Sequence, residues 1–327
     1  MPSAARRIAG SWVSSFRKGA RISSPSPIRK ANSKSQIPNP HALHWQVPLS
    51  CVCIPTPKHM LSNLTLIKAG TGVLTRTKDG TIDRAALVHL VAAISDLMNE
   101  GHRCMFVSSG AVGSGVSAMG LTEYPSDIVT RQACAAVGQA RLMRIYTSLF
   151  ANFDISVAQI LLTAGDIKGP QRAGYITNTL TRLLEEPRIL PIINENDTVA
   201  IRELNFGDND MLSVRVAKLV GAKRVILLTS VDGLLDPETK TLISDVHDVD
   251  EVFHHVRNDR GKFSMGGMAS KLKAVKFAVE EGIETHIANG RFPRRLVDIV
   301  NGKGISTKFH PNLIAKSEAP STPNTPS

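Results

Sequence analysis

From residue 64 onward, short apolar runs rich in β-branched residues alternate with longer segments in which apolar residues recur at helical spacing. Short continuous apolar runs are typical of strands buried on both faces, and helices of this length can connect parallel neighbours. The alternation therefore predicts an α/β fold, a three-layer αβα sandwich with a mainly parallel central sheet. The expected strands are Leu64–Lys68, Arg103–Val107, Ile155–Leu162, Ile189–Asn194, Arg224–Thr229 and Thr285–Ala288.

The segments between these strands carry the helical period. Apolar residues repeat at intervals of three and four from Ala86 to Met98, and Gly101 follows as a natural helix C-cap. Further helices are expected at residues 129–150, 172–185, 210–220 and 268–281. Together these elements predict one domain over residues 61–310, without internal repeats.

The positive charge of the chain is concentrated ahead of this domain. Residues 1–60 contain nine of the 39 Lys and Arg and no Asp or Glu, so the other 267 residues hold 30 basic against 28 acidic groups. The net charge of +11 therefore indicates no nucleic-acid surface on the domain, and no nucleic-acid partner is expected. No stretch approaches the roughly 18 consecutive apolar residues of a membrane-spanning helix, so no membrane partner is expected either. The four cysteines form no C-x-x-C pair, which argues against a disulfide scaffold or a structural zinc site.

Both ends of the chain have compositions typical of disorder. The leader, residues 1–60, is rich in Ser, Pro and Arg, and the tail, residues 311–327, is polar and Pro-rich. In the first 22 residues, basic and apolar side chains are interleaved as in a mitochondrial presequence. Two alternatives stay open: a dispensable extension, or an upstream mis-start with the true initiator at Met60. A cytoplasmic location is expected, or a mitochondrial one if the leader is a real presequence.

Small, polar and charged residues follow four of the expected strands. In parallel α/β sheets, ligands bind beyond the carboxyl ends of the strands, so these four segments are expected to converge on one site. Any one of them alone is equally well explained as an ordinary turn. The four segments are Lys68–Gly72, Ser108–Gly115, Asn194–Asp197 and Thr229–Gly233.

Several common nucleotide motifs are absent. No Walker A sequence exists, and the protein-kinase signatures are missing. The spacing Gly113-x-Gly115-x-x-Ala118 comes near a dinucleotide fingerprint, but it starts several residues past its strand and lacks the acidic residue expected downstream. P-loop and dinucleotide sites are therefore both disfavoured.

Two lysines point to phosphoryl transfer. Gly266 and Gly267 precede a helix that carries Lys271 in its first turns, a combination that can hold a phosphate through backbone dipoles and a point charge. Lys68 stands at the end of the first strand. Two lysines that flank a transferring phosphoryl group would neutralise the charge on its oxygens. Taken alone, the glycine pair is also consistent with a plain helix start.

The segment Asn194–Asp210 is dense in amides and carboxylates. A calcium loop starting at Asp208 fails, because Leu212 and Leu219 occupy positions that need oxygen ligands. An ordinary solvated loop is the alternative. Carboxylates at the start of this segment could hold an α-amino group, orient lysines or contact a metal.

With these motifs in place, the chain closely resembles the glutamate 5-kinases of the amino acid kinase family over residues 64–290. The pair INENDTVA and FGDND is specific within that family, because acetylglutamate kinase, aspartokinase and UMP kinase share the fold without it. The resemblance implies the amino acid kinase fold, which is carbamate kinase-like. The motifs that carry it are Lys68–Thr75, Val107–Val112, Gln132 with Gly138 and Gln139, Pro191–Ala200, Phe206–Asp210 and Gly266–Lys271.

The resemblance implies a phosphotransferase with a carboxyl group as acceptor: ATP phosphorylates the γ-carboxylate of L-glutamate, giving γ-glutamyl phosphate and ADP, the first step toward proline. It places Lys68 and Lys271 on the phosphates, with Asp210 between them as organiser. It places Ser109, Asp197 and Asn209 on the glutamate. Mg²⁺ accompanies ATP, held by the phosphates and water rather than by a dedicated protein cage. The residues that it places on the nucleotide are Lys68, Thr229, Ser230, Met265, Gly266, Gly267, Met268, Ala269, Ser270 and Lys271.

Three positions differ from many relatives, all of them near the expected nucleotide or phosphate contacts. Ser230 stands where Asp is common, Ser264–Met265 where Gly-Thr is usual, and Gly72 where Ser is common. The resemblance also implies a homo-oligomer and feedback inhibition by proline through a loop at residues 116–127. The 37 residues that follow Gly290 are too few for the PUA domain of many bacterial relatives.

Two other functions stay open. One is a different amino acid kinase that acts on N-acetylglutamate or aspartate. The other is a non-catalytic domain of kinase-like fold that senses nucleotide or proline. The differences around Ser230 and Met265 favour the sensor, whereas the intact Lys68, Lys271 and Asp210 favour catalysis.

Overall fold

The computed structural model describes residues 63–76, 81–200, 209–236, 238–258 and 265–311. The chain divides into a unit of residues 1–52, which lies wholly outside the described residues, and a unit of residues 53–327. The predicted disordered leader also lies outside the described residues, as do the tail from residue 312, Asp208 and Ser264.

Among the described residues, eight strands form one sheet in the order β3-β4-β2-β1-β5-β7-β8-β6. The strands are β1 (Leu64–Ala69), β2 (Arg103–Val107), β3 (Ser156–Leu162), β4 (Ile189–Glu195), β5 (Arg224–Thr229), β6 (Asp245–Val246), β7 (Glu284–Asn289) and β8 (Thr307–Phe309). The helices are α1 (Thr71–Leu74), α2 (Arg84–Asn99), α3 (Ala111–Ala118), α4 (Ile128–Phe150), η1 (Ala151–Phe153), α5 (Ala164–Lys168), α6 (Pro170–Glu185), α7 (Asn209–Val220), α8 (Val249–Asn258), α9 (Met265–Glu280) and α10 (Arg295–Val300).

The sheet is mainly parallel, as predicted. The six expected strands are present as β1 to β5 and β7, and all pairings among them are parallel. Among the described strands, the exception lies at one edge, where β8 pairs antiparallel with β7, and β6 then pairs parallel with β8. These two strands were not predicted, because two or three residues are too few to show a strand period.

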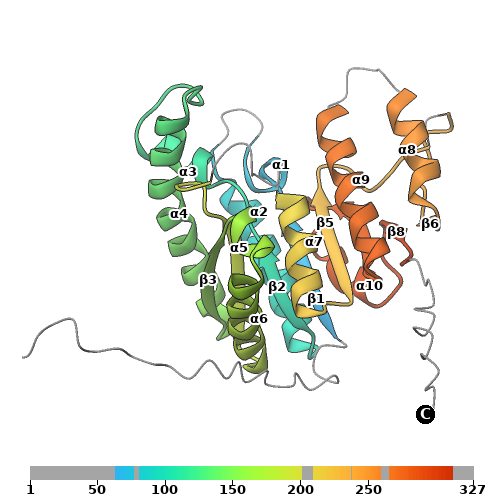
Figure 1. Ribbon diagram of the computed structural model, residues 1–327, viewed down its shortest axis with the longest axis horizontal. Helices are drawn as coiled ribbons and strands as arrows, with labels where there is room; N and C mark the ends of the chain where they lie inside the picture. Colours follow the sequence, from blue (N-terminus) through green and yellow to red (C-terminus); the bar gives the residue numbers. More distant parts are fainter. Residues whose placement is uncertain (1–62, 77–80, 201–208, 237, 259–264, 312–327) are drawn as a thin grey trace, which may run out of the picture. The chain divides into compact units, whose positions relative to one another are not determined.

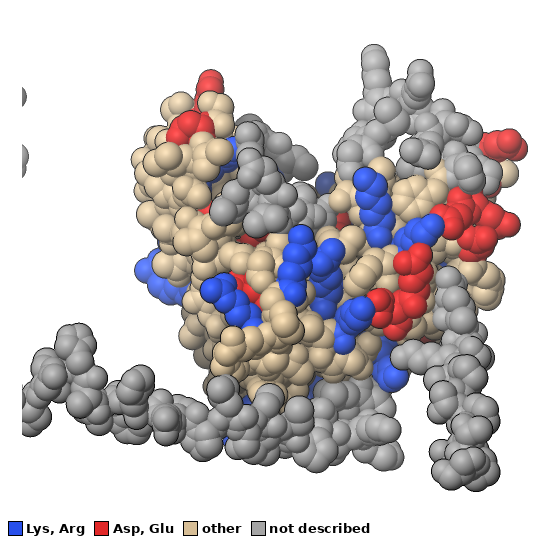
Figure 2. Space-filling model, in the orientation of Figure 1, with Lys and Arg blue, Asp and Glu red and all other residues tan. Residues whose placement is uncertain are grey.

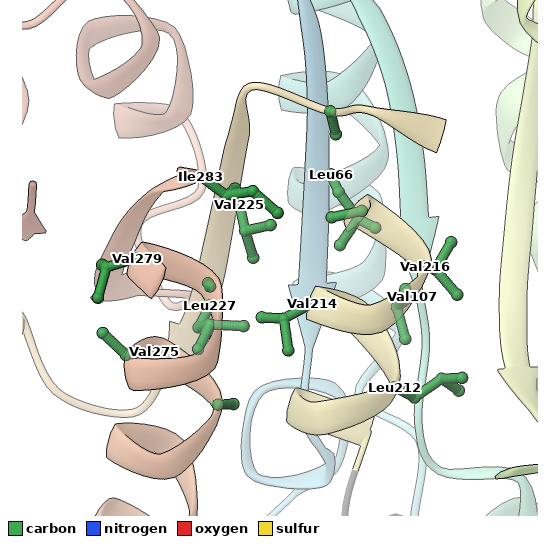
Figure 3. Close-up of a cluster of buried hydrophobic side chains, with 14 of the residues drawn as sticks. Leu66, Val107, Leu212, Val214, Val216, Val225, Leu227, Val275, Val279 and Ile283 are labelled. Atoms are coloured by element: carbon green, nitrogen blue, oxygen red, sulfur yellow. The ribbon is translucent and has the colours of Figure 1, made fainter. Parts of the chain in front are cut away.

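Alternate residues of the central strand β1 face two separate hydrophobic layers, which confirms the three-layer sandwich. Leu64 and Leu66 pack with residues of α7 and α9, whereas Ile67 and Ala69 pack with residues of α2, α4 and α10. In Figure 1, α6, α7 and α9 lie in front of the sheet. Figure 3 shows the first layer, in which the labelled residues are Leu66, Val107, Leu212, Val214, Val216, Val225, Leu227, Val275, Val279 and Ile283.

Local polar groups fix where the helices begin. The carboxylate of Asp83 accepts hydrogen bonds from the backbone N–H groups of Ala85 and Ala86, so α2 starts two residues before the predicted Ala86. Asp127 caps α4 in the same way through the N–H of Thr130. Within the described residues, no helix has both the length and the apolar character needed to cross a membrane.

The face shown in Figure 2 carries charges of both signs. Two ion pairs join partly exposed side chains: Lys218 pairs with Glu281 at 2.5 Å, and Lys276 pairs with Asp250 at 2.6 Å. Exposed pairs of this kind contribute about 0–1 kcal/mol each, so they influence solubility more than stability.

Helices α3 and α4 lie side by side because two glycines remove the side chains between them (Figure 1). A Cβ on Gly115 would lie 1.8 Å from the carbonyl oxygen of Cys134, and a Cβ on Gly138 would lie 1.8 Å from that of Ala111. Gly115 of the dinucleotide-like spacing therefore serves helix packing. The close contact between α3 and α4 also holds the start of α3, and with it the turn that connects β2 to α3.

We expect Gly115→Ala to destabilise the protein, because the new methyl group must push α3 and α4 apart. Overpacking of this kind costs about 1–3 kcal/mol, and sometimes more. Gly174→Ala on α6 is the matched control, because its Cβ would meet nothing within 4 Å and the change should stabilise by about 0.4–1 kcal/mol. Urea unfolding of both variants measures the difference, and equal stabilities would contradict the packing argument.

Candidate active site

A cleft of about 650 Å³ lies at the carboxyl ends of β1, β2, β4 and β5. The four polar segments predicted from the sequence all contribute to its wall, as the topology of a parallel sheet requires. The helices α7 and α9 complete it. The lining includes Lys68, Gly70, Thr71, Gly72, Ser109, Gly110, Asn194, Glu195, Asp197, Asn209, Asp210, Thr229, Ser230, Gly267, Met268 and Lys271.

A buried carboxylate at the base of the cleft joins two ammonium groups. Asp210 Oδ1 lies 2.5 Å from Lys68 Nζ, and Asp210 Oδ2 lies 2.7 Å from Lys271 Nζ. The Asp210 side chain is 0% exposed, against 4% for Lys68 and 17% for Lys271. The structure thus brings together the three residues predicted to be catalytic.

The charge state of this triad follows from its surroundings. Burial alone would raise the pKa of Asp210, but the two ammonium groups lower it by more than burial raises it. The pKa of Asp210 therefore lies below its ordinary value. Asp210 is therefore ionised at neutral pH. Two ammonium groups against one carboxylate leave the triad itself with a net positive charge, which suits a phosphate.

Three different elements supply the triad, and the hydrophobic core holds them together. Lys68 is the penultimate residue of β1, Asp210 lies in the first turn of α7, and Lys271 lies in the second turn of α9. These elements share the hydrophobic layer of Figure 3. Gly70 matters beside them, because a Cβ there would lie 3.1 Å from Lys68 Nζ and crowd the ammonium group. A Cβ on Gly72 would meet nothing within 4 Å, so the protein itself would accommodate a serine at this position.

A second polar group, made of amides, lies beside the triad. Asn209 Nδ2 donates to the carbonyl oxygen of Ser108 at 2.6 Å, to Ser109 Oγ at 3.0 Å and to Asn194 Oδ1 at 2.8 Å. Ser109, Asn209 and Asp197, the three predicted substrate residues, all line the cleft. Burial raises the pKa of Asp197 above its ordinary value.

The predicted nucleotide residues are only partly brought into the cleft. Thr229, Ser230, Gly267 and Met268 line it together with the two lysines. Met265 and Gly266 begin α9, and Ala269 and Ser270 follow within the helix without lining the cleft. The sequence motif covers consecutive residues at the start of the helix. Only one side of a helix can face a ligand, so some of these residues point away from the cleft.

Sequence reasoning named the loop at residues 116–127 but not Tyr124 within it, which lines the cleft. Tyr124 lies in the segment between α3 and α4, where burial, and after it the charge of Asp197, raises its pKa. A lone aromatic residue in a polar segment was the only local signal. Among the described residues, no group of three His, Cys, Asp or Glu is placed to hold a metal ion.

Comparison with known proteins places this geometry in a family. Residues 63–289 match the amino acid kinase family. The glutamate 5-kinase of Clostridium acetobutylicum is 40% identical over 264 residues, which cover 78% of this chain and 98% of that protein. The chain belongs to the amino acid kinase family, in its glutamate 5-kinase branch. The glutamate 5-kinase of Synechococcus elongatus (strain ATCC 33912) is 43% identical over 77% of this chain and 70% of that protein.

Solved structures agree on the fold. Carbamate kinase from Giardia lamblia bound to AMP-PNP has a TM-score of 0.55 at 16% identity, covering 77% of this chain and 99% of that one. N-acetylglutamate synthase from Neisseria gonorrhoeae, complexed with coenzyme A and N-acetyl-glutamate, has a TM-score of 0.57 at 14% identity, covering 77% of this chain and 60% of that one. The predicted amino acid kinase fold is therefore confirmed.

We expect Asp210→Asn to destabilise the protein strongly, because two lysine ammonium groups would then face each other without the carboxylate. Removing one partner of a buried ion pair costs about 3–5 kcal/mol. Asp250→Asn, which breaks the exposed pair with Lys276, is the matched control and should cost about 0–1 kcal/mol. Urea unfolding at neutral pH measures both, and a loss below about 1 kcal/mol for Asp210→Asn would show that the buried pair is dispensable for folding.

Proposed function

We propose that the protein phosphorylates the γ-carboxylate of L-glutamate with ATP, giving γ-glutamyl phosphate and ADP, the first step of proline biosynthesis. The observation that carries this proposal is the buried Lys68–Asp210–Lys271 triad beside an amide- and carboxylate-lined wall, in a chain of the glutamate 5-kinase branch. An enzyme with this triad needs no catalytic histidine.

The triad supplies what the transfer step requires. The acceptor carboxylate is already ionised at neutral pH, so no general base has to remove a proton. Lys68 and Lys271 neutralise the charge that spreads over the oxygens of the transferring phosphoryl group. Asp210 fixes both ammonium groups by direct contact, so they are oriented before the substrates arrive.

The amide wall holds the amino acid. The carboxylate of Asp197 and the side-chain amide oxygen of Asn209 are acceptors that suit an α-ammonium group. Ser109 offers a hydroxyl group. In this arrangement the α-amino end of glutamate lies at the amide wall, and its γ-carboxylate extends toward the lysines. Residues of the amide wall and the two lysines would therefore contact opposite ends of the same bound glutamate.

The nucleotide occupies the side of the cleft formed by Thr229, Ser230, Gly267 and Met268. Mg²⁺ accompanies ATP, held mainly by its phosphates and by water, because both oxygens of Asp210 are already engaged by lysines. The cation adds further charge neutralisation on the phosphates when bound.

The remaining proposals follow from family membership. They are a homo-oligomer, feedback inhibition by proline near the segment that carries Tyr124, and a domain over residues 61–310 between a leader and a tail. The location is cytoplasmic, or mitochondrial if the leader is a presequence.

Glutamate-dependent release of ADP tests the proposal. With Mg²⁺ and ATP, we expect ADP to form when L-glutamate is added, and hydroxylamine to trap the acyl phosphate as the γ-hydroxamate. N-acetylglutamate and aspartate serve as competing acceptors in parallel. Preference for either one would make the protein a different amino acid kinase, and tight nucleotide binding without turnover on any acceptor would make it a sensor.

Lys271→Ala separates catalysis from binding in the same assay. Loss of one preorganised charge lowers kcat on the order of 10²–10³-fold, while the KM for glutamate stays close to unchanged. Lys273→Ala, an exposed lysine on the same helix, is the control and should behave as wild type. A kcat within about threefold of wild type for Lys271→Ala would remove this lysine from the mechanism.

The KM for glutamate should rise as the pH falls, before the KM for ATP changes. Burial raises the pKa of Asp197 above its ordinary 3.8, whereas the lysines lower that of Asp210. Asp197 therefore gains its proton first on acidification, and a protonated carboxyl group no longer pairs with the α-ammonium group. Asp197→Asn should raise the KM at neutral pH by roughly 10- to 100-fold, the equivalent of one charged hydrogen bond, and flatten the pH profile. A variant whose profile still follows that of the wild type would assign the dependence to another group.

A further inference from the structure

One face of α4 contacts the ends of two neighbouring strands. Gln139 and Tyr146 are seven residues apart, which places them on the same side of the helix. The Tyr146 hydroxyl group lies 2.8 Å from Ser108 Oγ, directly after β2, and Gln139 Oε1 accepts a hydrogen bond of 2.9 Å from Asn194 Nδ2 in β4. The strands β2 and β4 are paired in the sheet.

The close approach of α4 makes these contacts possible. Gly138 leaves no side chain between the helix and the carbonyl oxygen of Ala111, where a Cβ would lie at 1.8 Å. Gln139 is the next residue along, and its amide reaches the buried Asn194. Gly138 therefore allows α4 to approach closely, and Gln139 makes the polar contact that this approach permits.

The hydrogen bonds around Asn194 fix which end of its side-chain amide accepts and which end donates. Asn194 Oδ1 accepts from the backbone N–H of Glu195 at 2.9 Å and from Asn209 Nδ2 at 2.8 Å. With its oxygen engaged, Asn194 turns its NH₂ group toward an acceptor, which is Gln139 Oε1. A side-chain amide has one accepting and one donating end, so each contact in this chain sets the orientation of the next.

This chain of hydrogen bonds ends at the cleft. Asn209 directs its NH₂ group at Ser108, Ser109 and Asn194, and its oxygen is then the end left for a ligand. In a cleft that Asp197 also lines, this oxygen suits an ammonium group, whereas an NH₂ group in its place would repel it.

We propose that Gln139 is a positioning residue for the acceptor amino acid: through Asn194 it fixes the side-chain amide of Asn209 with its carbonyl oxygen toward the α-ammonium group. This inference rests on the proposed function of the cleft. Without the Gln139 oxygen, the NH₂ group of Asn194 loses its acceptor, and only the backbone N–H of Glu195 still holds the Asn194 oxygen toward Asn209. The hydrogen bond from Asn209 to Asn194 is then held less firmly, and the side-chain oxygen of Asn209 is less well oriented toward the substrate.

Gln139→Leu tests this role, because leucine keeps the size of the side chain and removes the accepting oxygen. We expect the KM for glutamate to rise roughly tenfold, the loss expected for one oriented hydrogen bond, while the KM for ATP stays within about twofold. Gln171→Leu is the control, because this exposed glutamine on α6 donates only to Tyr175 in the same helix and should leave both constants unchanged. An unchanged KM for glutamate, or an equal rise for ATP, would overturn the proposal.

A double variant separates positioning from general loss of structure. If Gln139 acts through Asn209, then Gln139→Leu adds no further rise in the KM for glutamate once Asn209→Ala is present. A purely structural role would add its effect in both backgrounds, and that result would overturn the proposal.

Hydrogen exchange of the Asn209 side-chain amide tests the positioning without any turnover. The protons of this NH₂ group should exchange slowly in the wild-type protein and faster in Gln139→Leu, because the chain of hydrogen bonds no longer holds them. Equal exchange rates would overturn the proposal. If the wild type forms no ADP with glutamate, the proposed function fails, and the exchange rates still decide the role of Gln139.

Discussion

A carboxylate with no solvent exposure, held between two lysine ammonium groups, is the interaction around which this site is built. Burial of an isolated charge costs several kcal/mol, and the attraction between opposite charges offsets this only when the geometry is good. The rigid core provides that geometry, because β1, α7 and α9 meet in a single hydrophobic layer (Figure 3). The same arrangement leaves an excess positive charge facing the cleft, so the requirements of stability and of phosphate binding coincide.

The two sides of the cleft are supported by the two opposite layers of the sandwich. The charged side depends on α7 and α9, which pack on one face of the sheet. The amide side depends in addition on α4, whose Leu142, Tyr146 and Phe150 pack on the other face. The carboxyl ends of the strands lie between the two layers, so the amide side, which includes Asn209 of α7 and the contacts of α4, depends on both of them.

Local sequence patterns predicted the six long strands and the convergence of their ends, because burial on both faces leaves an unbroken apolar run. They also identified Lys68 and Lys271 as a pair. Asp210 was one carboxylate among several in its segment, and only the family resemblance singled it out. Gln139 and Tyr146 gave no local signal of their contacts, since their partners are 55 and 38 residues away and the contacts require α4 to lie against the turn after β2. Gly115, whose spacing comes near a dinucleotide fingerprint that the sequence itself disfavours, is required by helix packing.

The choice of acceptor must come from the amide side. The charges of Lys68 and Lys271 act on the phosphoryl group, which is the same whatever carboxylate receives it, so they contribute to rate without distinguishing one amino acid from another. Discrimination requires groups that contact the rest of the acceptor, and hydrogen-bonding groups reject a wrong partner strongly because an unmet buried donor or acceptor is costly. Asp197 and Asn209 are such groups, and the selectivity of Asn209 is only as good as the orientation of its amide. The hydrogen bonds that run from α4 through Asn194 are therefore as much a part of specificity as the residues that contact the substrate.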